Sequence, residues 1–133
     1  MPGSELRLVH LDSDFLIRAL ASSGPERRRI LALADAPAVI QMSAVAWYEF
    51  ARGPRTPEQL AVARSFLRAD GIVPLSEEIA TRAGIAFRLL GSPRRRAADV
   101  AIGVTAVVAG ATLVTCNARD FAGIPELRFE AVG

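Results

Sequence analysis

The chain has 133 residues, a formal net charge of +2 and 51% apolar residues, which indicates a single folded domain over residues 1–133 and argues against disorder. One cysteine, Cys116, excludes a disulfide within the chain and fits a reducing, cytoplasmic compartment. We find no apolar run of about 18 residues and no signal peptide pattern, so we expect no membrane span. All sixteen basic residues are arginine, which suits bidentate phosphate contacts, although composition is a weak guide to function.

Short apolar runs alternate with helical patterns along the chain. The predicted strands are residues 6–11, 38–42, 72–75, 112–116 and 127–132. The predicted helices are residues 13–21, 25–34, 44–51, 57–69, 76–90 and 97–109, with a loop at 91–96 and a tight turn at 117–121. This alternation favours an α/β fold, in which a central, mainly parallel five-stranded sheet carries helices on both faces. Ligands of such folds bind at the carboxyl ends of the strands.

Two acidic residues, Asp12 and Asp14, stand where the first predicted strand gives way to a helix. Apolar residues precede and follow them, so an uncompensated charge here costs several kcal/mol. Glu49 lies on the helix after the second strand, where a solvated surface position is the simpler interpretation. These acids need a compensating partner if they are buried.

The helix at 97–109 is apolar nearly all round, which is typical of a buried helix. Asp99 lies in its first turn, where it could simply stabilise the helix dipole, yet it shares a face with Ile102 and Ala106. After the fourth strand, Asn117 and Asp120 have the spacing of a capping box, so a structural role is open for both.

In a parallel sheet these positions can meet at one edge. Clustered carboxylates repel one another and raise each other's pKa values unless a cation lies among them. Oxygen ligands suit Mg²⁺ or Mn²⁺, whereas no histidine or cysteine cluster offers a zinc site. The only histidine, His10, is expected to be a structural neighbour of Asp12.

Four segments together resemble the PIN domain family, most closely its VapC-type ribonuclease toxins of type II toxin–antitoxin systems. They are LDSDFLIRAL, MSAVAWYEFARGP, RRRAADVAIGVTAVVAGATLVTCNARDF and FEAV, and they span nearly the whole chain. The resemblance implies a PIN-like three-layer α/β/α fold.

The resemblance also implies roles for individual residues. Asp12 and Asp99 would be the metal ligands, with Glu49 and Asp120 completing the catalytic acids. Ser13 matches the small hydroxyl residue usual beside the first acid, and Asn117 stands where the family often has an acid. Asp14 departs from the usual Asn or Ser, which leaves its role open.

The resemblance implies Mg²⁺- or Mn²⁺-dependent hydrolysis of RNA phosphodiester bonds by a toxin that forms homodimers and is silenced by a cognate antitoxin. The metal would activate water, and Glu49 or Asp120 could orient it or take its proton. Arg94, Arg95 and Arg96 are candidates for RNA contact, although a solvated loop is the simpler interpretation of such a run.

Two other functional classes compete with this one. Asp12-Ser13-Asp14 also resembles the nucleophile motif of haloacid-dehalogenase-type phosphatases, and receiver modules likewise place acids at strand ends. Both normally use a lysine, which this chain lacks. A catalytically weak or inactive PIN scaffold, binding an antitoxin or RNA, remains the alternative because Asn117 replaces an acid.

Overall fold

Five parallel strands within residues 7–133, which the computed structural model describes, form one sheet. They are β1 (Arg7–Leu11), β2 (Ala38–Ser43), β3 (Ile72–Val73), β4 (Thr112–Thr115) and β5 (Arg128–Ala131). The order across the sheet is β3-β2-β1-β4-β5, so the first strand of the chain lies in the middle. Every neighbouring pair is parallel, which confirms the predicted α/β class and five-stranded sheet.

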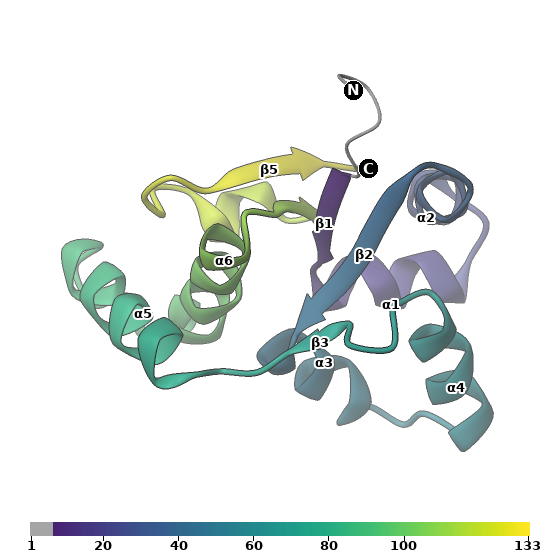
Figure 1. Cartoon of the computed structure of the whole chain (residues 1–133), viewed down its shortest axis with the longest axis horizontal. Coiled ribbons are helices and arrows are strands. Elements are labelled where there is room, and N and C mark those ends of the chain that lie inside the picture. Colours follow the sequence, from purple (N-terminus) through teal and green to yellow (C-terminus); the bar gives the residue numbers. More distant parts are fainter. Residues whose placement is uncertain (1–6) are drawn as a thin grey trace.

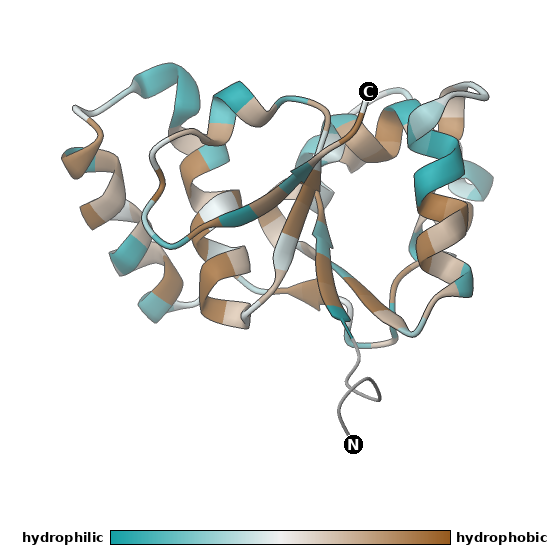
Figure 2. Ribbon diagram, turned by 90° about the horizontal axis from the view of Figure 1, so that it is seen from above, coloured by the Kyte–Doolittle hydropathy of each residue, from teal (hydrophilic) through white to brown (hydrophobic). Residues whose placement is uncertain are grey.

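Six helices in the described part of the chain connect these strands. They are α1 (Ser13–Ala21), α2 (Pro25–Asp35), α3 (Ala44–Ala51), α4 (Pro57–Ser65), α5 (Glu77–Leu89) and α6 (Ala97–Ala109), and two short 3-10 turns are η1 (Arg94–Arg96) and η2 (Ala118–Phe121). Helices α5 and α6 pack together on one side of the sheet, while α1 and α2 pack together on the other (Figures 1 and 2). Right-handed crossovers explain these layers, because the chain moves from β1 towards β3 along one face and returns to β4 along the other.

The core lies between the sheet and these helices. Figure 2 shows hydrophobic residues along the central strands, and Val9, Leu11 and Leu113 are fully buried there. Phe15 and Leu16 of α1 are fully buried as well. Arg7 at the start of β1 is exposed, whereas Asp12, directly after the carboxyl end of β1, is buried. Ser43 and Thr115, at the carboxyl ends of β2 and β4, are buried as well.

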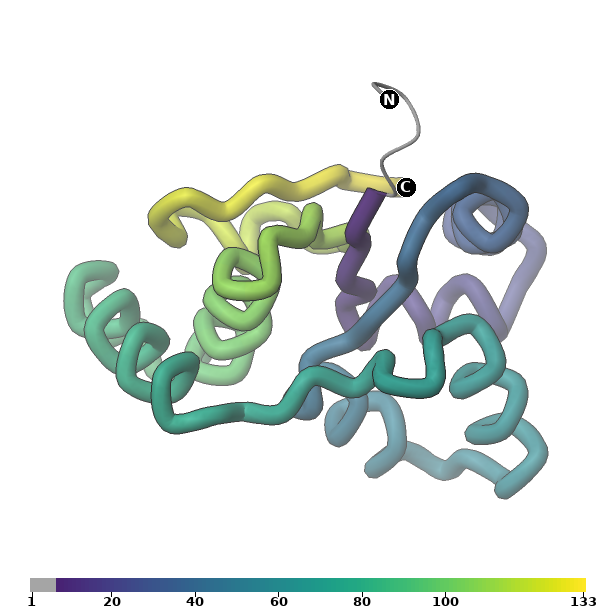
Figure 3. Tube along the Cα trace, viewed as in Figure 1, coloured from purple at the N-terminus to yellow at the C-terminus, as the bar shows by residue number. Residues whose placement is uncertain are grey.

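Side-chain caps start several helices at that end of the sheet. Asp12 precedes α1, and Ser43 Oγ accepts a hydrogen bond from the Ala46 amide at 3.0 Å, so α3 begins directly where β2 ends. The trace therefore leaves β1 and β2 at the same edge of the sheet and enters α1 and α3 (Figure 3). Helix α3 contacts both α1 and α6, which gathers three helices around this edge.

Several predicted boundaries differ from the structure. Helix α4 ends at Ser65 rather than 69, because the Arg68 amide bonds the Ile40 carbonyl of β2, and the Arg64 guanidinium donates to the carbonyls of Arg68 and Ala69 beyond the helix. Strand β3 ends at Val73 because Pro74 has no N–H for a ladder bond. The predicted loop 91–96 includes the 3-10 turn η1, and the other ends agree with the prediction or shift by one residue. Residue 6 of the first predicted strand lies outside the described residues.

None of the helices described here is both long and apolar enough to cross a bilayer.

Candidate active site

Asp12 is held rigidly at the carboxyl end of β1. It is 4% exposed, its Oδ1 accepts a hydrogen bond from the Ser13 amide at 2.8 Å, and its Oδ2 accepts one from Thr115 Oγ1 at 2.9 Å. Burial raises the pKa of Asp12 to about 6 against the lowering effect of these two bonds, and the carboxylates of Asp14 and Glu49 add to the rise. The charged form is therefore poorly compensated by the protein alone.

Thr115, at the end of β4, links Asp12 to the following turn. Its hydroxyl donates to Asp12 and accepts the Asn117 amide at 2.9 Å, so the hydrogen of the hydroxyl is directed at the carboxylate. Asn117 does not cap η2 with its side chain; its Nδ2 donates to Asp14 Oδ2 at 2.7 Å. The capping-box interpretation of Asn117 and Asp120 is therefore wrong, although the Asp120 amide does bond the Asn117 carbonyl.

Ser13 connects Asp12 to Glu49. Its side chain is buried, and its Oγ donates to Glu49 Oε1 at 3.0 Å. Glu49 is half-buried on α3, so the fully solvated position that its sequence context favoured is wrong. Since Ser13 follows Asp12 directly, this bond fixes the carboxylate of α3 beside the end of β1.

Asp99 is half-buried in the first turn of α6. Burial raises its pKa to about 7, and the negative charges of three neighbours contribute to the rise while Arg96 opposes it. Those neighbours are Asp12, Asp120 and Glu49, in decreasing order of effect. A carboxyl that merely complements a helix dipole would have a lowered pKa, so Asp99 belongs to a crowded acidic cluster.

A cavity of about 290 Å³ brings these groups together. Its lining combines five acids with one serine, one arginine and one apolar side chain: Asp12, Ser13, Asp14, Ile17, Glu49, Arg52, Asp99 and Asp120. These residues come from α1, α3, α6 and η2, from the residue after β1, and from Arg52, which directly follows α3. We call this space the acidic cavity. The convergence of residues 12, 49, 99 and 120, expected at one sheet edge, is present in the structure.

The acidic cavity fits a hard, hydrated divalent ion better than a metal enclosed by protein. No three acidic, histidine or cysteine side chains among residues 7–133 are arranged so that they could hold a metal ion together. Mg²⁺ commonly binds one or two carboxylates and keeps several waters. Asp12 and Asp99, whose pKa values rise through burial and mutual repulsion, are the pair with most to gain from such an ion.

The three consecutive arginines predicted to contact RNA have different surroundings. Arg94 and Arg95 are exposed on η1, whereas Arg96 is half-buried. Arg96 donates from Nε to the Asp120 carbonyl at 2.9 Å and from Nη2 to the Ala122 carbonyl at 2.5 Å. The sequence run hides this difference because all three residues are the same type.

Two residues of the site were not among those predicted from the sequence. Arg52 lines the acidic cavity, with its guanidinium 5.6 Å from the centroid of the exposed Tyr48 ring. It lies three residues after Glu49, directly beyond the end of α3, and that spacing was a usable signal. The role of Thr115 depends on β1 pairing with β4, in register Leu11 to Val114, which the sequence does not reveal.

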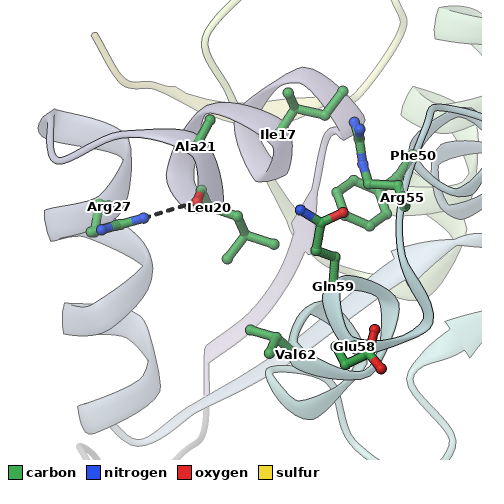
Figure 4. Close-up of a pocket in the computed structure, with 9 residues that line it drawn as sticks. All are labelled: Ile17, Leu20, Ala21, Arg27, Phe50, Arg55, Glu58, Gln59 and Val62. Carbon is green, nitrogen blue, oxygen red and sulfur yellow. Dashed lines mark hydrogen bonds between the residues drawn. The ribbon is translucent and has the colours of Figure 1, made fainter.

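A second hollow adjoins the acidic cavity and has the opposite chemistry. It has a volume of about 350 Å³ and lies between α1, α2, α3 and α4, and Figure 4 shows its lining: Ile17, Leu20, Ala21, Arg27, Phe50, Arg55, Glu58, Gln59 and Val62. We call it the apolar pocket. Arg27 donates to the Leu20 carbonyl at 2.9 Å, and the Arg55 guanidinium lies 4.6 Å from the centroid of the Phe50 ring. Ile17 lines both spaces, so they share a wall.

Comparisons with known proteins agree with this architecture. A family model described as PIN domain matches residues 9–127. The VapBC2 structure from Rickettsia felis contains a chain similar in fold, with a TM-score of 0.71, 20% identity, and coverage of 93% of this chain and 98% of that one. A chain of a toxin–antitoxin complex from Klebsiella pneumoniae has a TM-score of 0.69 and 24% identity, and the match covers 90% of this chain and 94% of that one. A chain of FitAcB from Neisseria gonorrhoeae has a TM-score of 0.67 and 19% identity, and the match covers 92% of this chain and 96% of that one. No curated protein is significantly similar in sequence.

Proposed function

Because this chain belongs to the PIN domain family, we propose that it is a Mg²⁺- or Mn²⁺-dependent endoribonuclease, the VapC-type toxin of a toxin–antitoxin pair in the cytoplasm. The observation that carries the proposal is the acidic cavity, where four carboxylates from separate parts of the chain converge. Asp12 and Asp99 have raised pKa values there, which indicates a site that a cation would stabilise.

The roles of the side chains follow from their contacts. Asp12 and Asp99 would hold the divalent ion, which supplies a water of lowered pKa and polarises the phosphoryl oxygen. The Ser13 hydroxyl occupies Glu49 Oε1, so Oε2 of Glu49 remains to orient the attacking water and accept its proton. Asp120, exposed at the rim of the acidic cavity, is the fourth acid and can assist the departure of the leaving group.

Recognition of RNA would depend on arginines rather than on extended base stacking. Arg52 lines the acidic cavity and can contact the scissile phosphate, and the exposed Arg94 and Arg95 can contact phosphates further along the strand. Ser13 and Asn117 lie close enough to the first acid to take part through their bonds to Glu49 and Asp14. Exposed Tyr48 beside Arg52 offers one surface for a base.

The apolar pocket is where a cognate antitoxin would bind. Its shared wall with the acidic cavity means that a segment lying on Ile17 could extend a basic side chain towards the carboxylates. Homodimer formation would use a different face. Ile85 and Leu89 of α5 are 56% and 74% exposed, and they border a hollow between α5 and α6 on the opposite side of the sheet.

Cleavage of a mixed RNA pool tests the proposal. The wild-type protein should cut RNA with Mg²⁺ or Mn²⁺ and not in excess chelator, and Asp99→Asn should lower the rate by about 100- to 1,000-fold, since metal-ion catalysis is worth several kcal/mol. Equal cleavage by both proteins would overturn the nuclease assignment. Absence of cleavage by either protein, with antitoxin binding retained, would favour the inactive scaffold.

A further inference from the structure

Arg96 ties together two segments that each carry an acid of the site. It directly precedes α6, and its guanidinium donates to the Asp120 carbonyl at 2.9 Å and to the Ala122 carbonyl at 2.5 Å. Those carbonyls belong to the last part of η2 and the residue that follows it. One side chain therefore joins the beginning of α6 to the turn that carries Asp120.

Apolar contacts also anchor the two segments. Phe121 is 1% exposed and holds η2 to the core. Ile124 packs against α6 so closely that a Cβ added at Gly103 would lie 2.7 Å from its Cδ1. Gly103 lies one turn beyond Asp99 on α6, so the contact of Ile124 does not reach the first turn of the helix. The two hydrogen bonds from Arg96 link the end of α6 that carries Asp99 directly to η2 and the residue after it.

We propose that Arg96 is a positioning residue, whose guanidinium holds the Asp120 turn against the start of α6 so that Asp99 and Asp120 face the same cavity. The inference deepens the nuclease function proposed above and depends on it. An arginine suits this role because its rigid planar fork donates to the two carbonyls from two separate nitrogens, whereas a lysine offers a single nitrogen on a flexible stem. The Nε–Nη2 edge that would bind a phosphate side-on is already occupied, in contrast to the exposed Arg94 and Arg95.

Steady-state kinetics on RNA separate positioning from substrate binding. Arg96→Ala should lower kcat by about 10- to 100-fold and leave KM nearly unchanged, since misplacing catalytic groups by about 1 Å has effects of this size. Its RNA affinity should keep the wild-type dependence on salt. Arg94→Ala and Arg95→Ala are the matched controls, and each should raise KM and reduce the slope of log affinity against log salt by about 0.7.

Arg96→Lys tests whether charge alone is sufficient. Because an ammonium cannot span both carbonyls in the same way, this variant should keep most of the loss in kcat. Restoration of the wild-type kcat by lysine would overturn the inference. A reduced salt slope in Arg96→Ala, equal to that of the controls, would overturn it as well and would place Arg96 on the RNA.

Amide hydrogen exchange provides a measurement that needs no activity. The Asp120 amide bonds the Asn117 carbonyl at 2.9 Å and the Ala122 amide bonds the Arg119 carbonyl at 3.3 Å. Both amides should exchange about 10-fold faster in Arg96→Ala, and at the wild-type rate in the two controls. Unchanged exchange would refute the inference. If the wild type cleaves no RNA, the proposed nuclease function fails on its own, and exchange still decides whether Arg96 holds the turn.

Discussion

The acidic cavity and the apolar pocket share Ile17 and differ in almost everything else. One is lined by five carboxylates and a single arginine at the carboxyl end of the sheet. The other lies between α1, α2, α3 and α4, and its lining combines five aliphatic and aromatic side chains with Arg27, Arg55, Glu58 and Gln59 (Figure 4). The two spaces are adjacent, so the difference arises from the side chains that α1 and α3 present on either side.

Each region lacks something that the other does not provide: the acidic cavity lacks positive charge, and the apolar pocket lacks an apolar partner. Negative charge in the acidic cavity is only partly offset, as the raised pKa values of Asp12 and Asp99 show, and a cation would correct it. Apolar surface in the apolar pocket is left uncovered, and burial against another apolar surface is worth about 25 cal/mol per Å². These two deficits are the reason for proposing an inorganic ion in the acidic cavity and a protein segment in the apolar pocket.

The same substitution made in each region should separate chemistry from docking. Glu49→Gln removes the proposed proton acceptor and should lower RNA cleavage by about 100-fold, within the range for general acid–base groups, measured as kcat on a defined RNA. Glu58→Gln, at the rim of the apolar pocket, is the matched control and should cleave RNA at the wild-type rate. Similar losses in both variants would remove the distinction between the two regions.

Removing the hydroxyl that orients Asp12 should have the next largest effect. Thr115→Val keeps the shape of the side chain and deletes the bond to Oδ2. We expect Mn²⁺ affinity, measured by calorimetry, to fall by about 10-fold, because partners that orient metal ligands typically contribute 10- to 100-fold. Thr112→Val on the same strand should bind Mn²⁺ like the wild type. An unaffected Thr115→Val would mean that Asp12 needs no such support.

A charge placed in the apolar pocket should affect only the protein partner. Val62 is 52% exposed on α4, so Val62→Glu should fold normally. We expect antitoxin affinity, measured by calorimetry with the cognate protein, to fall about 10-fold, since a buried aliphatic side chain is worth about 1.5–3 kcal/mol. RNA cleavage should be unchanged. Antitoxin binding at wild-type strength would place its docking site elsewhere.

The pH dependence of stability should show the smallest effect. Asp12 and Asp99 have pKa values of about 6 and about 7 in the folded protein, both raised from 3.8, so the folded state binds protons more tightly than the unfolded state. Their contribution to stability is complete below about pH 4 and is lost as the pH rises through 6 and 7. In chelator, the urea midpoint should therefore fall between pH 5 and pH 8, and it should fall less in Asp99→Asn. An equal fall in both proteins would mean that Asp99 is not destabilised by its neighbours.

The sequence predicted the fold well because its signals are local. Strands β1 and β2 appear as short apolar runs, Ser43 supplies the predicted cap, and α6 is apolar all round. Errors arose where a tertiary contact overrides propensity. The pattern of α4 continues beyond Ser65, yet the Arg68 amide bonds the Ile40 carbonyl of β2 and the chain leaves the helix.

The acids of the site were also predictable, whereas their connections were not. Asp12 and Asp99 could be selected because one follows a strand and the other opens a helix beside apolar residues, whereas Glu49 and Asp120 were selected through the resemblance to the PIN domain family. The bonds from Ser13 to Glu49 and from Thr115 to Asp12 span 36 and 103 residues. Such pairings depend on the order of strands and the seating of helices, and neither leaves a trace in the local pattern.

Thermal denaturation with and without Mn²⁺ tests the central claim, that Asp12 and Asp99 share one divalent ion. The wild-type Tm should rise as Mn²⁺ replaces chelator, because a ligand present at about 100 times its Kd stabilises the folded state by about 2.7 kcal/mol. Asp12→Asn and Asp99→Asn should lose this rise and should have a Tm in chelator at or above that of the wild type, since each removes a repelling charge. A wild-type Tm that ignores Mn²⁺, or variants that keep the full rise, would contradict the account.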